Sequence, residues 1–170
     1  PTRRSSDLAG GFRPGPGAVL ATDGRVIEAP PGPLTVAQAS GVLAENESAA
    51  LVDLGDGVAC LTLKTKMNVC EPGVFEIVGR ALELGERGEF AALVIGSDHP
   101  RAFSAGANLN VFASLVERND PDELRHFTEL GQGSFARLRA ASFPVVAAAR
   151  GLALGGGCEL MLAAHHVVAG

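Results

Sequence analysis

Apolar and polar positions follow two different patterns in the middle of the chain. Two β-prone runs, residues 50–54 and 58–63, flank the turn Gly55-Asp56-Gly57, an arrangement that is typical of a β-hairpin. After Pro72 the apolar residues recur at the three- and four-residue spacing of a half-buried helix, which ends near Gly88. The pattern therefore predicts a hairpin that is followed by a helix.

The next part of the chain alternates strands with helices. Residues 91–95 predict a buried strand, and the small-residue passage 96–109 leads from that strand towards a helix. A longer helix begins after Asp120, because a Pro at the first position and an acidic first turn are helix-start signals. Phe143-Pro144 ends that helix, and residues 145–149 predict another buried strand. This order predicts an α/β fold whose parallel strands are joined by right-handed crossovers.

The strand at 145–149 leads into a glycine-rich turn, Gly155 to Gly157, before the apolar segment 160–164. The first amides of a helix have no intrahelical partner, so this bare backbone can direct N–H groups at a developing negative charge. Glu159 falls in the first helical turn, where the helix dipole favours a carboxylate. The stretch alone leaves two interpretations open for Glu159, a general base and a simple dipole partner.

Residues 1–47 are rich in Gly and Pro, which predicts a linker or junction. A short strand pair at 18–28 and a helical turn or two after Thr35 are expected within it. The opening residues lack periodicity and the chain stops inside an apolar run, so we expect an artificial N-terminus and a fragment truncated at both ends. Residues 48–170 are then predicted to form the first half of a domain.

Composition excludes several classes of protein. A net charge of −5 without any basic block argues against nucleic-acid binding. Cys60, Cys70 and Cys158 are too few and too irregularly spaced for a disulfide framework or a zinc site, so we expect reduced thiols, no metal and a cytoplasmic location. No apolar stretch approaches the roughly 20 residues of a membrane span.

Two long motifs carry a resemblance to a known family. Arg101 to Leu109, and Pro144 to Ala148 continuing through Gly151 to Leu160, resemble the crotonase (enoyl-CoA hydratase/isomerase) superfamily. The resemblance covers about residues 50–170 and implies an incomplete spiral of β-β-α units, about the first half of that domain. Residues 17–42, with Lys66-Met67-Asn68, resemble the junction of fused proteins in which a 3-hydroxyacyl-CoA dehydrogenase precedes the crotonase part.

The resemblance also implies a substrate site. The thioester carbonyl of an acyl-CoA would lie between the backbone N–H groups of Ala107 and Gly156, and losing one such donor typically lowers the rate by about 10²–10³. The backbone around Ala105 and Leu109 would meet the adenine of CoA, and Arg101 would lie at the CoA end of the site. The substrate-binding residues implied are Arg101, Ala105, Gly106, Asn108, Leu109 and Gly155. Hydratases often carry Asp where this chain has Asn108, whose amide can still hydrogen-bond the loop.

The implied activity is that of an enoyl-CoA hydratase of fatty-acid β-oxidation, a lyase. Glu159 matches one of the two acidic residues that handle the added water, and the other would lie beyond Gly170, so we expect residues 1–170 alone to be inactive. No cofactor is implied for the crotonase part, and NAD only if a dehydrogenase domain lies upstream. The full-length protein would bind acyl-CoA and is able to form an oligomer.

Alternative functions remain open at this point. Isomerase or thioester hydrolase chemistry would use the same pair of N–H donors with different acids, and a non-catalytic acyl-CoA-binding module would need no second acid. A dinucleotide-binding oxidoreductase is disfavoured, because the glycines between Gly151 and Gly157 miss the G-x-G-x-x-G spacing.

Overall fold

The computed structural model describes residues 18–20, 26–28 and 35–170. It divides the chain into two units, Pro1–Leu34 and Thr35–Gly170. In the first unit, β1 (Ala18–Leu20) pairs antiparallel with β2 (Val26–Glu28), which confirms the expected strand pair. The remainder of the predicted linker before residue 35 lies outside the described residues.

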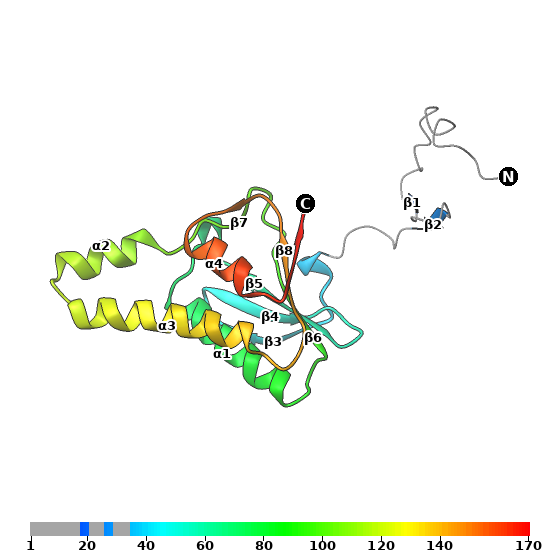
Figure 1. The fold of residues 1–170 in the computed structure, drawn as a ribbon, viewed down its shortest axis with the longest axis horizontal. Helices are drawn as coiled ribbons and strands as arrows, with labels where there is room; N and C mark the ends of the chain where they lie inside the picture. The colour runs from blue at the N-terminus through cyan, green and yellow to red at the C-terminus, as the bar shows by residue number, and fades with distance from the viewer. Residues whose placement is uncertain (1–17, 21–25, 29–34) are drawn as a thin grey trace, which may run out of the picture. The chain divides into compact units, whose positions relative to one another are not determined.

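A mixed sheet of six strands forms the base of the second unit (Figure 1). Its strands are β3 (Gly41–Glu45), β4 (Ala49–Asp53), β5 (Val58–Leu63), β6 (Ala92–Ile95), β8 (Val145–Ala149) and β10 (His166–Ala169). The spatial order is β10-β8-β6-β5-β4-β3. Strands β3, β4 and β5 pair antiparallel, which confirms the β4–β5 hairpin, whereas β5, β6, β8 and β10 pair parallel.

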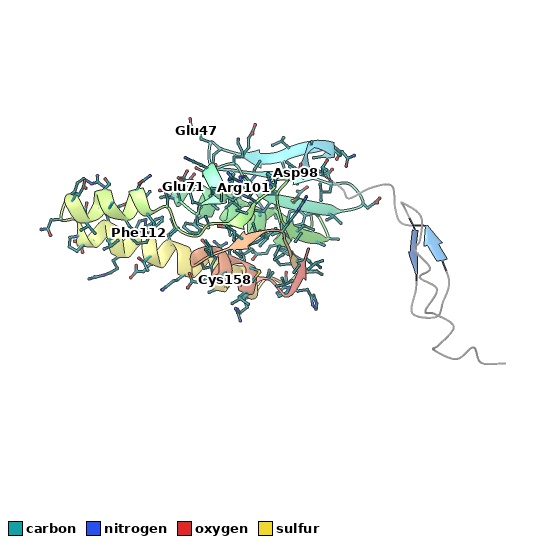
Figure 2. The ribbon with its side chains drawn as sticks, turned by 90° about the horizontal axis from the view of Figure 1, so that it is seen from above. Glu47, Glu71, Asp98, Arg101, Phe112 and Cys158 are labelled. Atoms are coloured by element: carbon teal, nitrogen blue, oxygen red, sulfur yellow. The ribbon has the colours of Figure 1, made fainter. Side chains whose placement is uncertain are left out.

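The helices and a second, two-stranded sheet complete the unit. They are α1 (Pro72–Glu86), α2 (Leu109–Glu117), α3 (Pro121–Arg139), α4 (Gly156–Ala163), β7 (Ala102–Ser104) and β9 (Leu152–Ala153), with short 3-10 turns η2 (Val36–Gln38) and η3 (Lys66–Asn68). Strands β7 and β9 pair parallel. Helices α2 and α3 lie side by side and extend beyond the edge of the sheet (Figures 1 and 2).

The β-β-α order expected from the resemblance occurs three times. The units are β4-β5-α1, then β6-β7-α2, then β8-β9-α4. In each later unit the first strand joins the large sheet and the second joins the small one. The α/β spiral is therefore confirmed. Of the helices in the described residues, none is both long and apolar enough to cross a bilayer.

Helix α1 separates the sheet from α3. Its predicted apolar stripe is buried, and it contacts strands β3 to β6 on one side and α3 on the other. Helix α3 is continuous through Gly131, which lets the Phe75 ring approach: a Cβ there would lie 3.2 Å from Phe75 Cζ. Close packing of helix on helix is thus the role of this glycine.

The compact unit begins earlier than the boundary expected near residue 47. Strand β3 hydrogen-bonds β4, and Val36 and Ala39 pack on the face of β4 and β5 opposite α1. The Asp98 carboxylate accepts hydrogen bonds from the N–H groups of Val36 (3.1 Å) and Ala37 (3.2 Å). Residues 35–47 are therefore tied to the sheet, although their composition resembles that of a linker.

Helix α1 offers a matched pair of glycines for testing this packing. A Cβ on Gly85 would collide with the Phe143 ring, which is held by an edge-to-face contact with Phe90 at 5.4 Å between centroids. Gly85→Ala should therefore destabilise the fold by about 1–3 kcal/mol through overpacking. A Cβ on Gly79 would lie 3.8 Å from Arg137 Nη1, so Gly79→Ala should be neutral or stabilise by up to about 1 kcal/mol. Urea denaturation of both variants checks this, and equal midpoints would contradict it.

Candidate active site

Two backbone segments, residues 104–107 and 154–157, lie against each other beside the small sheet. The Leu154 N–H donates to the Ser104 carbonyl at 3.0 Å, which extends the β7–β9 pairing. Gly106 is buried with a φ of +94°, and a Cβ on it would lie 2.6 Å from the Leu154 carbonyl oxygen. A Cβ on Gly157 would collide with the Ser104 carbonyl. Only glycine permits this approach, which explains the glycines that the sequence places in both segments.

A β-bridge to Cys70 holds Ala107 so that the Ala107 N–H points away from Cys70. The Cys70 N–H donates to the Gly106 carbonyl at 2.7 Å, and the Asn108 N–H donates to the Cys70 carbonyl at 2.9 Å. Those two bonds flank Ala107 in a parallel bridge, which turns its N–H to the opposite side. A Cβ placed on Gly156 would lie 3.5 Å from the Ala107 nitrogen, so the two predicted donors are close neighbours.

Neither of these two N–H groups has an acceptor among the residues that the structure describes. Gly156 is the first residue of α4, where an amide has no intrahelical partner, and Gly155 before it adopts a φ of +46° that turns the chain into the helix. Ala107 and Gly156 are half-buried and line one cavity, so these two adjacent N–H groups are free to donate to a ligand oxygen there.

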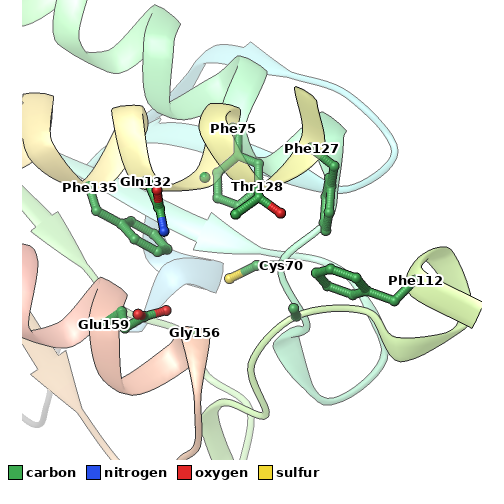
Figure 3. A pocket seen from close by; sticks show the side chains of 11 residues that line it. Cys70, Phe75, Phe112, Phe127, Thr128, Gln132, Phe135, Gly156 and Glu159 are labelled. Atoms are coloured by element: carbon green, nitrogen blue, oxygen red, sulfur yellow. The ribbon is translucent and has the colours of Figure 1, made fainter. Parts of the chain in front are cut away.

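A cavity of about 100 Å³ opens at these donors (Figure 3). Its lining consists of Cys70, Phe75, Ala107, Phe112, Phe127, Thr128, Gly131, Gln132, Phe135, Gly156 and Glu159. Glu159 lies in the first turn of α4, as predicted, and its Oε2 would lie 3.7 Å from a Cβ on Gly156. The three residues predicted as catalytic, Ala107, Gly156 and Glu159, thus share one cavity.

Aromatic side chains form the wall opposite α4. Four of the chain's eight Phe residues line the cavity, and their rings contact one another: Phe75 lies 6.1 Å from Phe127 and 5.8 Å from Phe135, and Phe112 lies 5.1 Å from Phe127. Thr128 and Gln132, one helical turn apart on α3, add polar groups to this side. The wall opposite α4 is therefore mainly aromatic, with two polar side chains from α3.

These wall residues were not among the site residues predicted from the sequence. Phe127 and Phe135 lie within the longer helix predicted after Asp120, and Cys70 was expected only to be a reduced thiol. The composition gives a weak signal for an aromatic wall, since the chain contains Phe but no Trp or Tyr. It does not reveal which rings meet, because these residues come from three different helices.

Cys70 is buried beside Ser104, with 3.7 Å between Sγ and Oγ. Burial raises the pKa of the Cys70 thiol, the Ser104 contact lowers it, and the negative charge of Glu159 raises it further. The net direction is upward, so the thiol stays protonated and neutral at ordinary pH. Cys70 therefore contributes an uncharged surface to the cavity.

The other predicted substrate-binding residues lie around the cavity. Gly106 is buried behind Ala107, and the Asn108 side chain accepts a hydrogen bond from the Asn110 N–H at 3.1 Å as the N-cap of α2. Arg101 is exposed, with Nη2 3.9 Å from Met67 Sδ (Figure 2). Leu109 is 77% exposed. None of the predicted substrate-binding residues is in the lining of the cavity in the described part of the chain, and their roles in binding CoA stay predictions.

Metal binding finds no support in the geometry. Within the described ranges, no three His, Cys, Asp or Glu side chains come close enough together to hold a metal ion. His165, one of two adjacent histidines, instead accepts a hydrogen bond from the Val145 N–H at Nδ1, with Nε2 3.0 Å from the Arg139 carbonyl oxygen. That ring ties the start of β8 to the segment after α4.

Comparisons with known proteins show which sequences this chain resembles. A family profile described as enoyl-CoA hydratase/isomerase matches residues 53–170. The chain is 34% identical over 132 residues to a Bacillus subtilis protein named probable 3-hydroxyacyl-CoA dehydrogenase, covering 78% of this chain and 16% of that protein. It is 34% identical over 114 residues to the fatty acid oxidation complex subunit alpha of Idiomarina loihiensis, covering 65% of this chain and 16% of that protein.

A solved structure shows the same fold. The enoyl-CoA hydratase from Bacillus anthracis superposes with a TM-score of 0.65 at 24% identity, covering 72% of this chain and 47% of that one. The chain therefore spans about half the length of this structural relative and less than a fifth of the two curated relatives.

The thiols provide a test of the cavity's polarity. Burial raises the pKa of Cys60 to about 11, and the pKa of Cys70 is also raised, whereas Cys158 is partly exposed. Because the thiolate is the reactive form, and each unit of pKa lowers its fraction about tenfold, native alkylation at pH 8 should label Cys158 first. Mass spectrometry after a short iodoacetamide pulse measures this. Labelling of Cys70 as fast as that of Cys158 would contradict the buried, neutral thiol.

Proposed function

We propose, because the chain belongs to the enoyl-CoA hydratase/isomerase family, that its cavity binds the acyl thioester of a CoA ester and that the protein acts as an enoyl-CoA hydratase. The observation that carries the proposal is the pair of unpaired N–H groups, Ala107 and Gly156, beside the Glu159 carboxylate in the described part of the chain. The names of the curated relatives support a role in fatty-acid oxidation.

The two N–H groups are suited to stabilise the negative charge that develops during the reaction. Water adds to the β-carbon of a 2-enoyl thioester, and negative charge develops on the thioester oxygen as an enolate forms. Two fixed donors stabilise that oxygen more strongly in the transition state than in the ground state, and they need no reorganisation during the reaction. The thioester carbonyl would therefore accept from both Ala107 and Gly156.

Glu159 would act as the acid or base for the added water. It is the only carboxylate among the residues that line the cavity in the described part of the chain, and it comes from the same helix turn as the Gly156 donor. A carboxylate takes a proton from water as the oxygen attacks, and a second acid supplies the proton at the α-carbon. That second acid is not among the described residues that line the cavity.

The acyl group would lie against the aromatic wall. Phe75, Phe127 and Phe135 remove apolar surface from water, which favours a hydrocarbon chain over a charged group. The CoA part would extend from the cavity towards Arg101, whose exposed guanidinium suits a phosphate. Hydration transfers no electrons, so no redox cofactor is needed here, and NAD would belong to a dehydrogenase domain of a longer protein.

Glu159→Gln tests the catalytic assignment in the full-length protein. The substitution keeps the size and hydrogen-bonding capacity of the side chain and removes its charge. We expect kcat for a short 2-enoyl-CoA to fall by about 10²–10⁴ with little change in acyl-CoA affinity, because a positioned acid or base acts on the chemical step. Loss of the 2-enoyl absorbance measures the rate.

The matched control for this variant is Glu129→Gln, which removes an exposed carboxylate of α3 that does not line the cavity. It should leave kcat unchanged. If Glu159 only complements the helix dipole, Glu159→Gln would instead retain nearly full turnover and lose about 0.3–1 kcal/mol of stability. Product analysis for double-bond migration and for free CoA separates hydratase from isomerase and thioester hydrolase activity.

Selectivity for thioesters tests the binding assignment independently of turnover. In the proposed site, two N–H groups donate to a neutral carbonyl. The negative charge of Glu159 is nearby, so a free carboxylate should be repelled. Calorimetry should show an acyl-CoA binding at least about tenfold more tightly than the corresponding free acid, a difference of about 1.4 kcal/mol. Equal affinities would contradict recognition through the oxyanion pair.

A further inference from the structure

Both polar atoms of the Asn108 side chain form hydrogen bonds. Its Oδ1 accepts from the Asn110 N–H at 3.1 Å, which caps α2, and its Nδ2 donates to Glu71 Oε2 at 2.9 Å. The Asn108 backbone N–H also donates to the Cys70 carbonyl, next to Ala107. Side chain and backbone together fix the residue that directly follows the predicted Ala107 donor.

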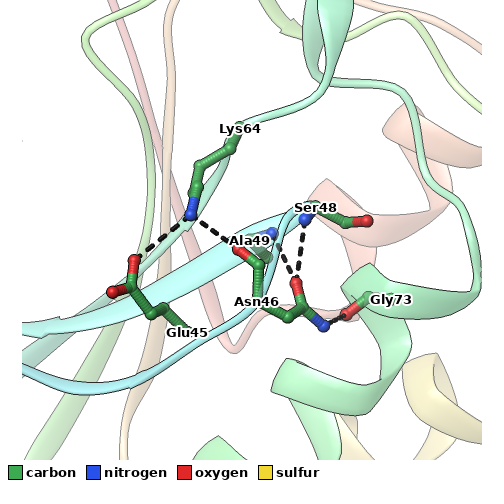
Figure 4. A network of polar contacts seen from close by, with 6 residues as sticks. All are labelled: Glu45, Asn46, Ser48, Ala49, Lys64 and Gly73. Carbon is green, nitrogen blue, oxygen red and sulfur yellow. Dashed lines mark hydrogen bonds and ion pairs between the residues drawn. The ribbon is translucent and has the colours of Figure 1, made fainter.

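Glu71 is itself anchored on its other oxygen. The Ser48 hydroxyl donates to Glu71 Oε1 at 2.6 Å, and Ser48 is 8% exposed. The turn that carries Ser48 is braced by Asn46, which accepts from the Ser48 N–H at 2.9 Å and donates to the Gly73 carbonyl at 2.8 Å (Figure 4). The Glu71 carboxylate therefore connects the β3–β4 turn and the start of α1 to Asn108.

We propose that Glu71 and Asn108 are a matched pair of positioning residues that holds the Ala107 N–H in place. The assignment rests on the proposed oxyanion role of that N–H. Glu71 presents only acceptor oxygens, so it requires a donor at position 108, while the α2 N-terminus requires an acceptor there. An amide is the side chain of this size that supplies both.

Few other charges act on this pair. Glu47 and Lys66 line the same cleft as Glu71, Asn108 and Asn110, and both are exposed. In the described residues, Arg101 and Glu159 do not line this cleft, and neither forms a hydrogen bond to the pair. The acid and the amide can therefore be exchanged between positions 71 and 108 to test this contact.

Isosteric substitutions can reverse the polarity of the contact without changing its size. Asn108→Asp places two carboxylates side by side, and Glu71→Gln places two amides there. The double variant Glu71→Gln/Asn108→Asp restores every bond: the new amide at position 71 donates to the new carboxylate at position 108 and accepts from Ser48, while that carboxylate still caps α2. Asn110→Asp is the matched control, because it adds the same charge in the same cleft, while the Glu71 carboxylate bonds Ser48 and Asn108 rather than Asn110.

The first readout is independent of activity. Hydrogen exchange of peptides spanning residues 104–112 should be at least about tenfold faster in Asn108→Asp, unchanged in Asn110→Asp, and close to wild type in the double variant. The defect of Asn108→Asp should shrink as the pH falls from about 8 to about 5, because protonating one carboxylate regenerates a donor. The folded state then binds more protons than the unfolded state, so its stability falls as the pH rises.

The second readout is catalysis in the full-length protein. Displacement of a catalytic donor lowers the rate by about 10²-fold per ångström, so Asn108→Asp should lower kcat by about tenfold to a hundredfold with a smaller change in KM. The double variant should recover to within about threefold of wild type. Rescue of both exchange and kcat supports positioning of the donor.

Several outcomes would overturn the pairing. They are a double variant as defective as Asn108→Asp, an Asn110→Asp control with the same defect, and a defect of Asn108→Asp that does not depend on pH. Rescue of hydrogen exchange without rescue of kcat would leave Glu71 and Asn108 as structural residues only, and would overturn the positioning role. A wild-type protein without hydratase activity would reject the proposed function, while the exchange experiment would still decide whether the two residues are coupled.

Discussion

The contact between residues 104–107 and 154–157 is the constraint on which the site depends. Gly106 and Gly157 each lie where a Cβ would meet the backbone of the other segment, so the approach is limited by main-chain atoms rather than by side chains. Such a contact has a fixed geometry because it contains no rotamers. The chain gains from it a definite spacing between the Ala107 and Gly156 nitrogens, and the parallel pairing of β7 with β9 sets the register of the two segments.

The other residues of the cavity are placed relative to the Ala107 and Gly156 nitrogens. Helix α4 begins at one of the donors and therefore places Glu159 one turn away, whatever the side chains of the opposite wall are. The opposite wall is built by α1, α2 and α3, whose phenylalanines pack on one another. The polar half of the site is thus fixed by backbone and the apolar half by side-chain packing. Substitutions among the phenylalanines can therefore change the shape of the apolar half without changing the backbone contact that fixes the polar half.

The sequence predicted the parts of this arrangement that depend on local patterns. The β4–β5 hairpin, α1 and the glycine turn into α4 each have a signal within a few residues. The resemblance added the pairing of Ala107 with Gly156, which periodicity alone does not give. What could not be predicted depends on contacts between distant segments: the Cys70 bridge that turns the Ala107 N–H, and the phenylalanine wall. The boundary near residue 47 was misplaced because proline and glycine content outweighed the apolar contacts of Val36 and Ala39.

Charge explains why the neighbour of Ala107 is an amide. Glu71 is a carboxylate close to the proposed oxyanion donors, and its two oxygens are occupied by Ser48 and Asn108. A second carboxylate at position 108 would repel Glu71 and would remove the N–H donor that now meets Glu71 Oε2. With Asn108, the helix cap is kept, Glu71 is satisfied, and Glu159 remains the only anionic group among the described residues of the cavity lining. Asn108 therefore satisfies the Glu71 carboxylate and caps α2 at the same time.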